Sequence, residues 1–252
     1  MRIIICRHGD PDYEHDSLTE RGVREAELLS ERLVEYYYPS KIYCSPLGRA
    51  QLTAKPTVEK TGVQPVTLDW LREYPLSANI FERDGDRGWI CPWEVPHGEW
   101  YPDAQANDPS HWLESERCAG TGFDEYQKQI RAGIDEMMAD RGLVREGDFY
   151  RAAPEFEKHR DENIHIFCHY GMTLAILAAV LPLSGLTLWN GFSLDSSSVT
   201  ELITDKVSPD TFILRCMRLG DISHLYRSGL PLGKAPREWW YCDSGKDTGP
   251  KV

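Results

Sequence analysis

The chain has 252 residues, 27% charged and 41% hydrophobic, which is the composition of an ordinary globular protein and fits one large domain over residues 1–252. The formal net charge of −12 and the lack of a basic stripe argue against a nucleic-acid partner. No apolar run reaches the roughly 20 residues of a membrane span, and the seven cysteines form no disulfide-like pattern, so we expect a cytoplasmic protein with reduced thiols and no membrane partner.

The first stretch, residues 2–9, pairs a buried strand with reactive side chains. Residues 3–6 are apolar and mostly β-branched, which predicts a strand buried on both faces. Arg7, His8 and Gly9 follow at once, where ligands collect in an open α/β sheet. Arginine offers a donor fork for phosphate or carboxylate, histidine can act as a nucleophile, and glycine allows close backbone approach. Because the chain carries a large negative charge, an anion-binding site must be a local region of positive potential lined by arginines.

The next elements continue the alternation of helices and strands. Residues 17–20 have the form of a capping box and predict a helix that ends near residues 36–39. A strand over 41–44 runs into Ser45 and Pro46, which we expect to be the N-cap and the first helical position. Arg49 then lies in the first turn of that helix, beside free N–H groups that attract anions.

Residues 74–122 show no clean periodicity and are rich in tryptophan and proline. So long an irregular segment is improbable as a mere linker. We interpret it as an insertion that packs over the active-site face. The alternative is a satellite that packs only on itself and contacts no substrate.

The second half of the chain predicts further layers of the same fold. We expect helices over 123–141 and 172–181, strands over 164–168, 196–204 and 211–217, and a polar elbow between 149 and 162. His169 follows the strand over 164–168, as His8 follows the first strand. A parallel sheet can therefore bring both histidines to one edge.

Four of these stretches together resemble the histidine phosphatase superfamily, the phosphoglycerate-mutase-like proteins. They occur in the family's order and are Arg7-His8-Gly9, Ser45-Pro46-Leu47-Gly48-Arg49-Ala50, Leu71-Arg72-Glu73 and residues 164–171. The resemblance implies an α/β fold, a three-layer sandwich with a mostly parallel central sheet and helices on both faces. It also places substrate-selecting excursions at the position of residues 74–122.

The resemblance further implies roles for individual residues. His8 would attack phosphorus and become phosphohistidine, while His169, Arg7 and Arg49 hold the phosphoryl group. Glu73 would donate a proton to the leaving oxygen and then activate water, with Asp10 as an alternative acid. The arginines and imidazoles supply the positive charge, so we expect neither a metal nor a cofactor.

Differences between this sequence and the family's sequence pattern help to choose between a phosphatase and a mutase. Many relatives carry Glu-Thr or Glu-Ser after the first glycine, with a nearby Trp-Asn, whereas this chain has Asp10, Pro11 and Asp12. A phosphoglycerate-type mutase is therefore disfavoured, and the prediction is a histidine acid-type phosphatase, a phosphoric monoester hydrolase acting on a small phosphorylated substrate. A catalytically silent phosphate-binding protein on the same fold is a third alternative. The residues expected to hold the phosphoryl group are all present, however, and these are Arg7, His8, Arg49 and His169. The tryptophan-rich insertion suggests a partly apolar or aromatic leaving group, and a homo-oligomer is left open.

Overall fold

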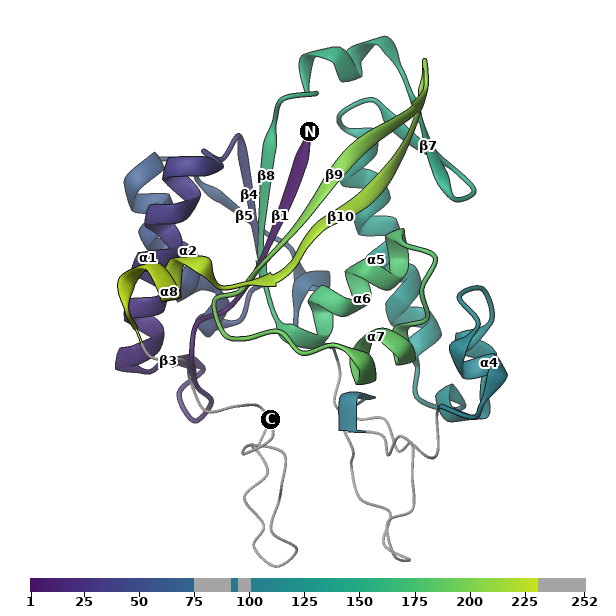
Figure 1. Cartoon of the computed structure of the whole chain (residues 1–252), viewed down its shortest axis with the longest axis horizontal. Coiled ribbons are helices and arrows are strands. Elements are labelled where there is room, and N and C mark those ends of the chain that lie inside the picture. The colour runs from purple at the N-terminus through teal and green to yellow at the C-terminus, as the bar shows by residue number, and fades with distance from the viewer. Residues whose placement is uncertain (75–91, 95–100, 231–252) are drawn as a thin grey trace, which may run out of the picture.

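The structure is a computed structural model that describes residues 1–74, 92–94 and 101–230. Its centre is an eight-stranded sheet in the order β5-β4-β8-β1-β9-β10-β7-β6 (Figure 1). The strands are β1 (Arg2–Arg7), β4 (Lys41–Cys44), β5 (Pro65–Thr67), β6 (Leu143–Glu146), β7 (Phe149–Ala152), β8 (Asn163–Cys168), β9 (Val199–Ser208) and β10 (Thr211–Asp221). A separate two-stranded ribbon joins β2 (Pro11–Asp12) to β3 (Ser17–Leu18).

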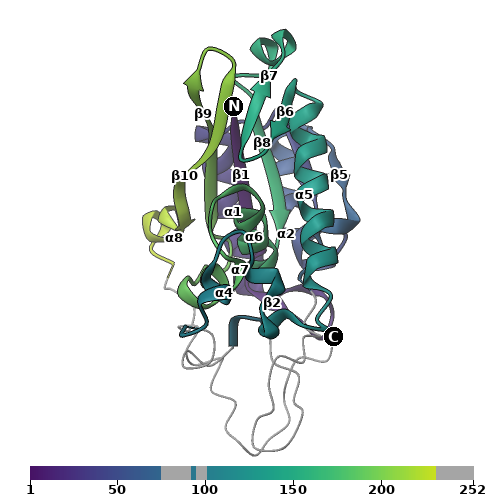
Figure 2. The same cartoon turned by 90° about the vertical axis from the view of Figure 1, so that its right-hand side faces the viewer.

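Helices cover both faces of this sheet, which confirms the predicted three-layer α/β sandwich. Figures 1 and 2 show α1, α2 and α8 on one face and α5, α6 and α7 on the other. The α-helices are α1 (Glu20–Tyr36), α2 (Gly48–Thr61), α4 (Ala104–Asn107), α5 (Phe123–Ala139), α6 (Tyr170–Val180), α7 (Gly185–Gly191) and α8 (Ser223–Ser228). Short 3-10 turns are η1 (Asp69–Leu71), η2 (Pro92–Glu94), η3 (Trp112–Glu114), η4 (Glu116–Cys118) and η5 (Pro154–Lys158).

Strand β1 is buried on both faces because its side chains alternate between two hydrophobic cores. Ile3 and Ile5 join the core beneath α5 and α6, whereas Ile4 and Cys6 join the core beneath α1 and α2. All four are at most 1% exposed. The first strand therefore lies at the centre of the molecule, as its unbroken apolar run predicted.

The sheet is parallel in one half and antiparallel in the other, so it is less parallel than the sequence suggested. Strands β5, β4, β8 and β1 pair in parallel, and the remaining neighbours pair antiparallel. Short connections such as β6–β7 and β9–β10 can join only antiparallel neighbours. The β6–β7 hairpin is one that the sequence did not predict: residues 149–152 fall within the predicted polar elbow, and no element is predicted for residues 143–146.

The helix boundaries refine two sequence predictions. Helix α1 has Thr19 as its N-cap, and the Thr19 hydroxyl accepts the Gly22 N–H at 3.1 Å. The expectation that Ser45 caps the next helix is wrong: α2 begins at Gly48 with Leu47 as N-cap. The Ser45 hydroxyl instead bonds a histidine across the sheet, as described below, and Arg49 still lies in the first turn.

The described parts of segment 74–122 pack against the α5–α7 side. Trp112 is 3% exposed, and its ring meets Trp189 of α7 edge-on at 5.6 Å. Trp93 lies against Tyr170 at the start of α6, with ring centroids 5.1 Å apart. Residues 75–91 and 95–100 of the predicted insertion lie outside the described residues.

Two further observations concern the described part of the chain. None of its helices is long and apolar enough to cross a membrane. Its cysteines (Cys6, Cys44, Cys118, Cys168 and Cys216) are free thiols.

We predict that Gly22→Ala destabilises the fold by about 1–3 kcal/mol. A Cβ at Gly22 would lie 2.2 Å from the Asp10 carbonyl oxygen, where α1 approaches the segment after β1. Because alanine is otherwise favoured over glycine in a helix, a loss of stability would reflect this contact alone. Urea unfolding measures the effect.

Gly191→Ala is the matched control, because a Cβ at this helical glycine meets nothing within 4 Å. It should leave the unfolding midpoint nearly unchanged or raise it. A Gly22→Ala variant as stable as the wild type would contradict the close approach.

Candidate active site

The pairing of β1 with β8 brings the two candidate histidines together. The strands are parallel neighbours, with Arg7 opposite Cys168, so His8 and His169 leave the sheet at the same level. Their ring centroids are 5.3 Å apart, and both side chains are at most 1% exposed. The sequence prediction that both lie at one edge is what the structure shows.

The hydrogen bond of His8 determines which of its ring nitrogens keeps a lone pair. His8 Nδ1 lies 2.7 Å from the carbonyl oxygen of Gly9. A carbonyl oxygen only accepts hydrogen bonds, so Nδ1 carries the proton and Nε2 keeps its lone pair. The Gly9 N–H donates to the Thr53 hydroxyl at 2.9 Å, which fixes this corner to α2. Burial, with the neighbouring Arg7, holds the pKa of His8 well below its ordinary value, so the ring is neutral near pH 7.

His169 is the N-cap residue of α6 and is held by a residue from the end of β4. Its Nε2 lies 2.8 Å from the Ser45 hydroxyl. Its Nδ1 is buried and has no hydrogen-bond partner among the described residues. Burial, with His8 beside it, also keeps the pKa of His169 well below its ordinary value.

Arg7 is fixed by contacts on two sides. Nη1 donates to the Leu194 carbonyl oxygen, and the guanidinium lies 5.4 Å from the ring centroid of Tyr170. Its Nε is buried without a partner in the described part of the chain. The guanidinium is thus oriented while one donor remains available to an anion.

Arg49 is oriented by Asp16, which comes from the β2–β3 ribbon. Nη1 donates to Asp16 Oδ1 at 2.6 Å, and Asp16 Oδ2 accepts the Gly48 N–H at 2.6 Å. The Arg49 Nε is likewise buried without a partner among these residues. The positive charges of both arginines lower the pKa of His8 and that of His169.

Glu73 lies at the amino-terminal end of α6, beside the histidines. Its Oε1 accepts the N–H groups of Met172 at 2.9 Å and of Tyr74 at 2.8 Å, and Oε2 accepts the Gly171 N–H at 3.3 Å. Burial raises the pKa of Glu73 above its ordinary value, against the opposing effects of these N–H groups and of the arginines. A carboxyl group that keeps its proton to higher pH suits a general acid.

Asp10, the alternative acid, points into a different set of contacts. Its Oδ2 accepts the Thr19 hydroxyl at 2.7 Å, and its backbone N–H donates to Glu25 at 2.9 Å. The Asp10 carboxylate therefore supports the start of α1. The geometry favours Glu73 as the proton donor.

Three residues of this site were not singled out as site residues from the sequence: Ser45, Asp16 and Tyr13. Ser45 was interpreted as a helix cap, and residues 10–16 as a polar loop. Only Asp16 has an unusual backbone, with φ at 45°, and no local pattern signals that conformation. Their roles come from contacts with residues far along the chain.

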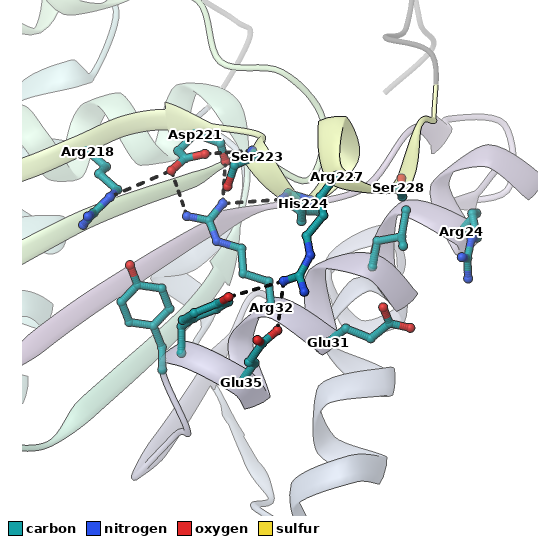
Figure 3. Close-up of a pocket in the computed structure, with 13 residues that line it drawn as sticks. Arg24, Glu31, Arg32, Glu35, Arg218, Asp221, Ser223, His224, Arg227 and Ser228 are labelled. Atoms are coloured by element: carbon teal, nitrogen blue, oxygen red, sulfur yellow. Dashed lines mark hydrogen bonds and ion pairs between the residues drawn. The ribbon is translucent and has the colours of Figure 1, made fainter.

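A cavity of about 720 Å³ lies elsewhere, between α1, the end of β10 and α8 (Figure 3). Its lining includes Arg32, Asp221 and His224, and Arg32 donates to Asp221 Oδ2 at 2.9 Å. None of the five candidate site residues lines it. Positive and negative side chains are paired along this groove, so it offers no cluster of free cations for a phosphate.

The chain belongs to the histidine phosphatase superfamily (branch 1), because the sequence model of that family matches residues 3–142. The match includes four of the five candidate site residues, and His169 lies beyond it. No curated protein matches the chain by sequence.

Solved structures share the fold at low sequence identity. Mycobacterial glucosyl-3-phosphoglycerate phosphatase is 23% identical over 87% of this chain and 98% of its own, with a TM-score of 0.56. A phosphoserine phosphatase variant from Entamoeba histolytica, solved with phosphoserine, is 15% identical over 89% and 98% of the two chains, with a TM-score of 0.58. The alpha-ribazole phosphatase of Shigella flexneri is 19% identical over 88% and 96%, with a TM-score of 0.53.

We predict that Ser45→Ala weakens the binding of inorganic phosphate by about three- to tenfold, the value of one buried hydrogen bond. The His169 ring would lose the partner of its Nε2 and with it a fixed orientation. Calorimetric titration with phosphate measures the dissociation constant.

Ser30→Ala is the control, since Ser30 is also buried and hydrogen-bonded but lies in α1, where it contacts Glu27 and Lys60. It should bind phosphate as the wild type does. Equal affinities in the wild type and Ser45→Ala would show that Ser45 does not orient His169.

Proposed function

We propose that the protein is a metal-independent phosphatase that hydrolyses a small phosphomonoester through a phosphohistidine on His8. The observation that carries this proposal is the convergence of a neutral, tautomerically fixed His8 with His169 and two oriented arginines. Buried nitrogen atoms of Arg7, Arg49 and His169 have no partner among the described residues. Together they offer the donors that a phosphoryl group needs.

In the first step, His8 Nε2 attacks phosphorus as the bond from phosphorus to the ester oxygen breaks. Arg7, Arg49 and His169 stabilise the charge on the equatorial oxygens. Glu73 in its protonated form gives its proton to the leaving oxygen, so an alcohol departs and a phosphohistidine remains.

In the second step, the Glu73 carboxylate takes a proton from water as the water oxygen attacks phosphorus. The nitrogen–phosphorus bond breaks, inorganic phosphate forms, and His8 returns to its neutral state with Glu73 protonated again. The positive charge comes from side chains that this chain already holds in place, so neither step calls for a metal.

The first test is hydrolysis of p-nitrophenyl phosphate in excess EDTA by the wild type and by His8→Ala. We expect activity in the wild type, and a fall of at least about 10³-fold in the variant, on the scale seen when a nucleophile is removed from a covalent mechanism. Equal activity in both would exclude His8 as the nucleophile. A mutase would instead isomerise a phosphorylated substrate and respond to a bisphosphate primer.

The second test is the pH dependence of kcat/KM, which should be bell-shaped. Because the pKa of His8 is lowered, the nucleophile is lost only as the pH falls through that lowered value. Because the pKa of Glu73 is raised, the acid is lost as the pH rises through that raised value. Glu73→Gln should remove the basic limb and slow alkyl phosphates by about 10²–10⁴-fold.

The same variant should lower kcat/KM for p-nitrophenyl phosphate much less, because kcat/KM reports the first step and p-nitrophenolate departs without protonation. Asp10→Asn is the matched comparison and should keep the basic limb. A basic limb that persists in Glu73→Gln and vanishes in Asp10→Asn would reassign the acid to Asp10.

A further inference from the structure

The β2–β3 ribbon holds a hairpin tip, residues 13–16, next to Arg49. Asp16 contacts both Gly48 and Arg49, as described above, and a Cβ at Gly48 would lie only 2.2 Å from the Asp16 carbonyl oxygen. Asp16 itself adopts a left-handed conformation, with φ at 45°. The tip is therefore clamped to the start of α2, and residues within it have a fixed place relative to the phosphate-binding arginines.

Tyr13 lies at this tip and contacts Arg49 of the candidate site. Its ring centroid lies 5.5 Å from the Arg49 guanidinium carbon. Burial raises the pKa of its hydroxyl; the nearby Arg7 guanidinium, a hydrogen-bond partner of that hydroxyl, opposes this, and the charge of Glu73 adds to it. The residue is nevertheless 43% exposed, which places the ring at the border between the site and solvent.

Trp93 adjoins Glu73 from another segment of the chain. A Cβ at Gly171 would lie 2.3 Å from the Trp93 ring and 3.0 Å from Glu73 Oε1, so ring and carboxyl group meet over Gly171. The Trp93 ring is braced edge-on by Tyr170, with an interplanar angle of 87°. Glu73 thus has the Trp93 ring as a neighbour, and Tyr13 lies against Arg49 in the same site.

The geometry points to Tyr13 as a specificity-determining residue that favours phosphomonoesters whose leaving group carries an aromatic ring. This inference rests on the proposed function, because the leaving oxygen must approach Glu73 to receive its proton. The atoms attached to that oxygen then lie beside Tyr13 and Trp93. Aromatic contacts of this kind favour a ring over an alkyl chain, since they add stacking to simple burial.

The test compares kcat/KM for phenyl phosphate and for β-glycerophosphate in the wild type, Tyr13→Ala and Tyr13→Phe. Tyr13→Ala should lower the value for phenyl phosphate about three- to tenfold more than the value for β-glycerophosphate, as expected for the loss of one aromatic pair. The lower kcat/KM for phenyl phosphate should result from a higher KM, with kcat little changed. Tyr13→Phe should keep the preference, because the ring is retained.

Intrinsic leaving-group reactivity cancels when each variant is compared with the wild type on the same ester. Tyr226→Ala is the matched control, because Tyr226 is 64% exposed on α8, outside the site. It should leave both esters unchanged. The competitors phenylphosphonate and methylphosphonate, which cannot be hydrolysed, give a second readout: Tyr13→Ala should weaken calorimetric binding of the phenyl compound more than that of the methyl compound.

The outcomes separate the two proposals. Equal losses on both esters, or unchanged selectivity and phosphonate binding in Tyr13→Ala, would overturn the role of Tyr13 while leaving the phosphatase intact. Failure of the wild type to hydrolyse either ester in a His8-dependent way would overturn the proposed function. In that case, binding of phenylphosphonate no tighter than methylphosphonate would overturn the aromatic preference as well.

Discussion

The parallel pairing of β1 with β8 is the constraint on which the site depends. Backbone hydrogen bonds set the register, and the register places His8 and His169 at the same level with their rings 5.3 Å apart. Hydrophobic cores on both faces of β1 keep the pairing rigid, since Ile3 and Ile5 serve one core and Ile4 and Cys6 the other. The chemistry thus depends on strand geometry, which is more rigid than loop geometry.

Burial then determines the protonation states. Arg7 and Arg49 bring positive charge into a chain whose net charge is −12, and contacts with Leu194 and Asp16 hold their guanidinium groups in place. Burial lowers the pKa of both histidines and raises that of Glu73. The site therefore combines a neutral imidazole at His8, fixed cations and a carboxyl group that keeps its proton to higher pH, which are the groups that the proposed phosphoryl transfer needs.

The sequence predicted those parts of the site whose signals are local. An unbroken apolar run followed by Arg7-His8-Gly9 predicts both a central strand and a reactive end, and the strand before His169 is recognisable for the same reason. Contacts between distant residues have no such signal. The Asp16–Arg49 pair spans 33 residues and the Ser45–His169 bond spans 124, so neither could be found before the fold was known. The sequence gives no signal for strands β6 and β7 because each is only four residues long and includes charged residues, and β6 lies at the edge of the sheet.

The most direct measurement of the central claim is the site of phosphorylation during turnover. Rapid mixing with substrate, an alkaline quench that preserves phosphohistidine, and mass spectrometry of the peptides would locate the phosphoryl group. The account predicts that it resides on His8 in the wild type, and that it accumulates when Glu73→Gln slows the water step. Phosphate on another residue, or turnover without any phosphorylated enzyme, would contradict the account.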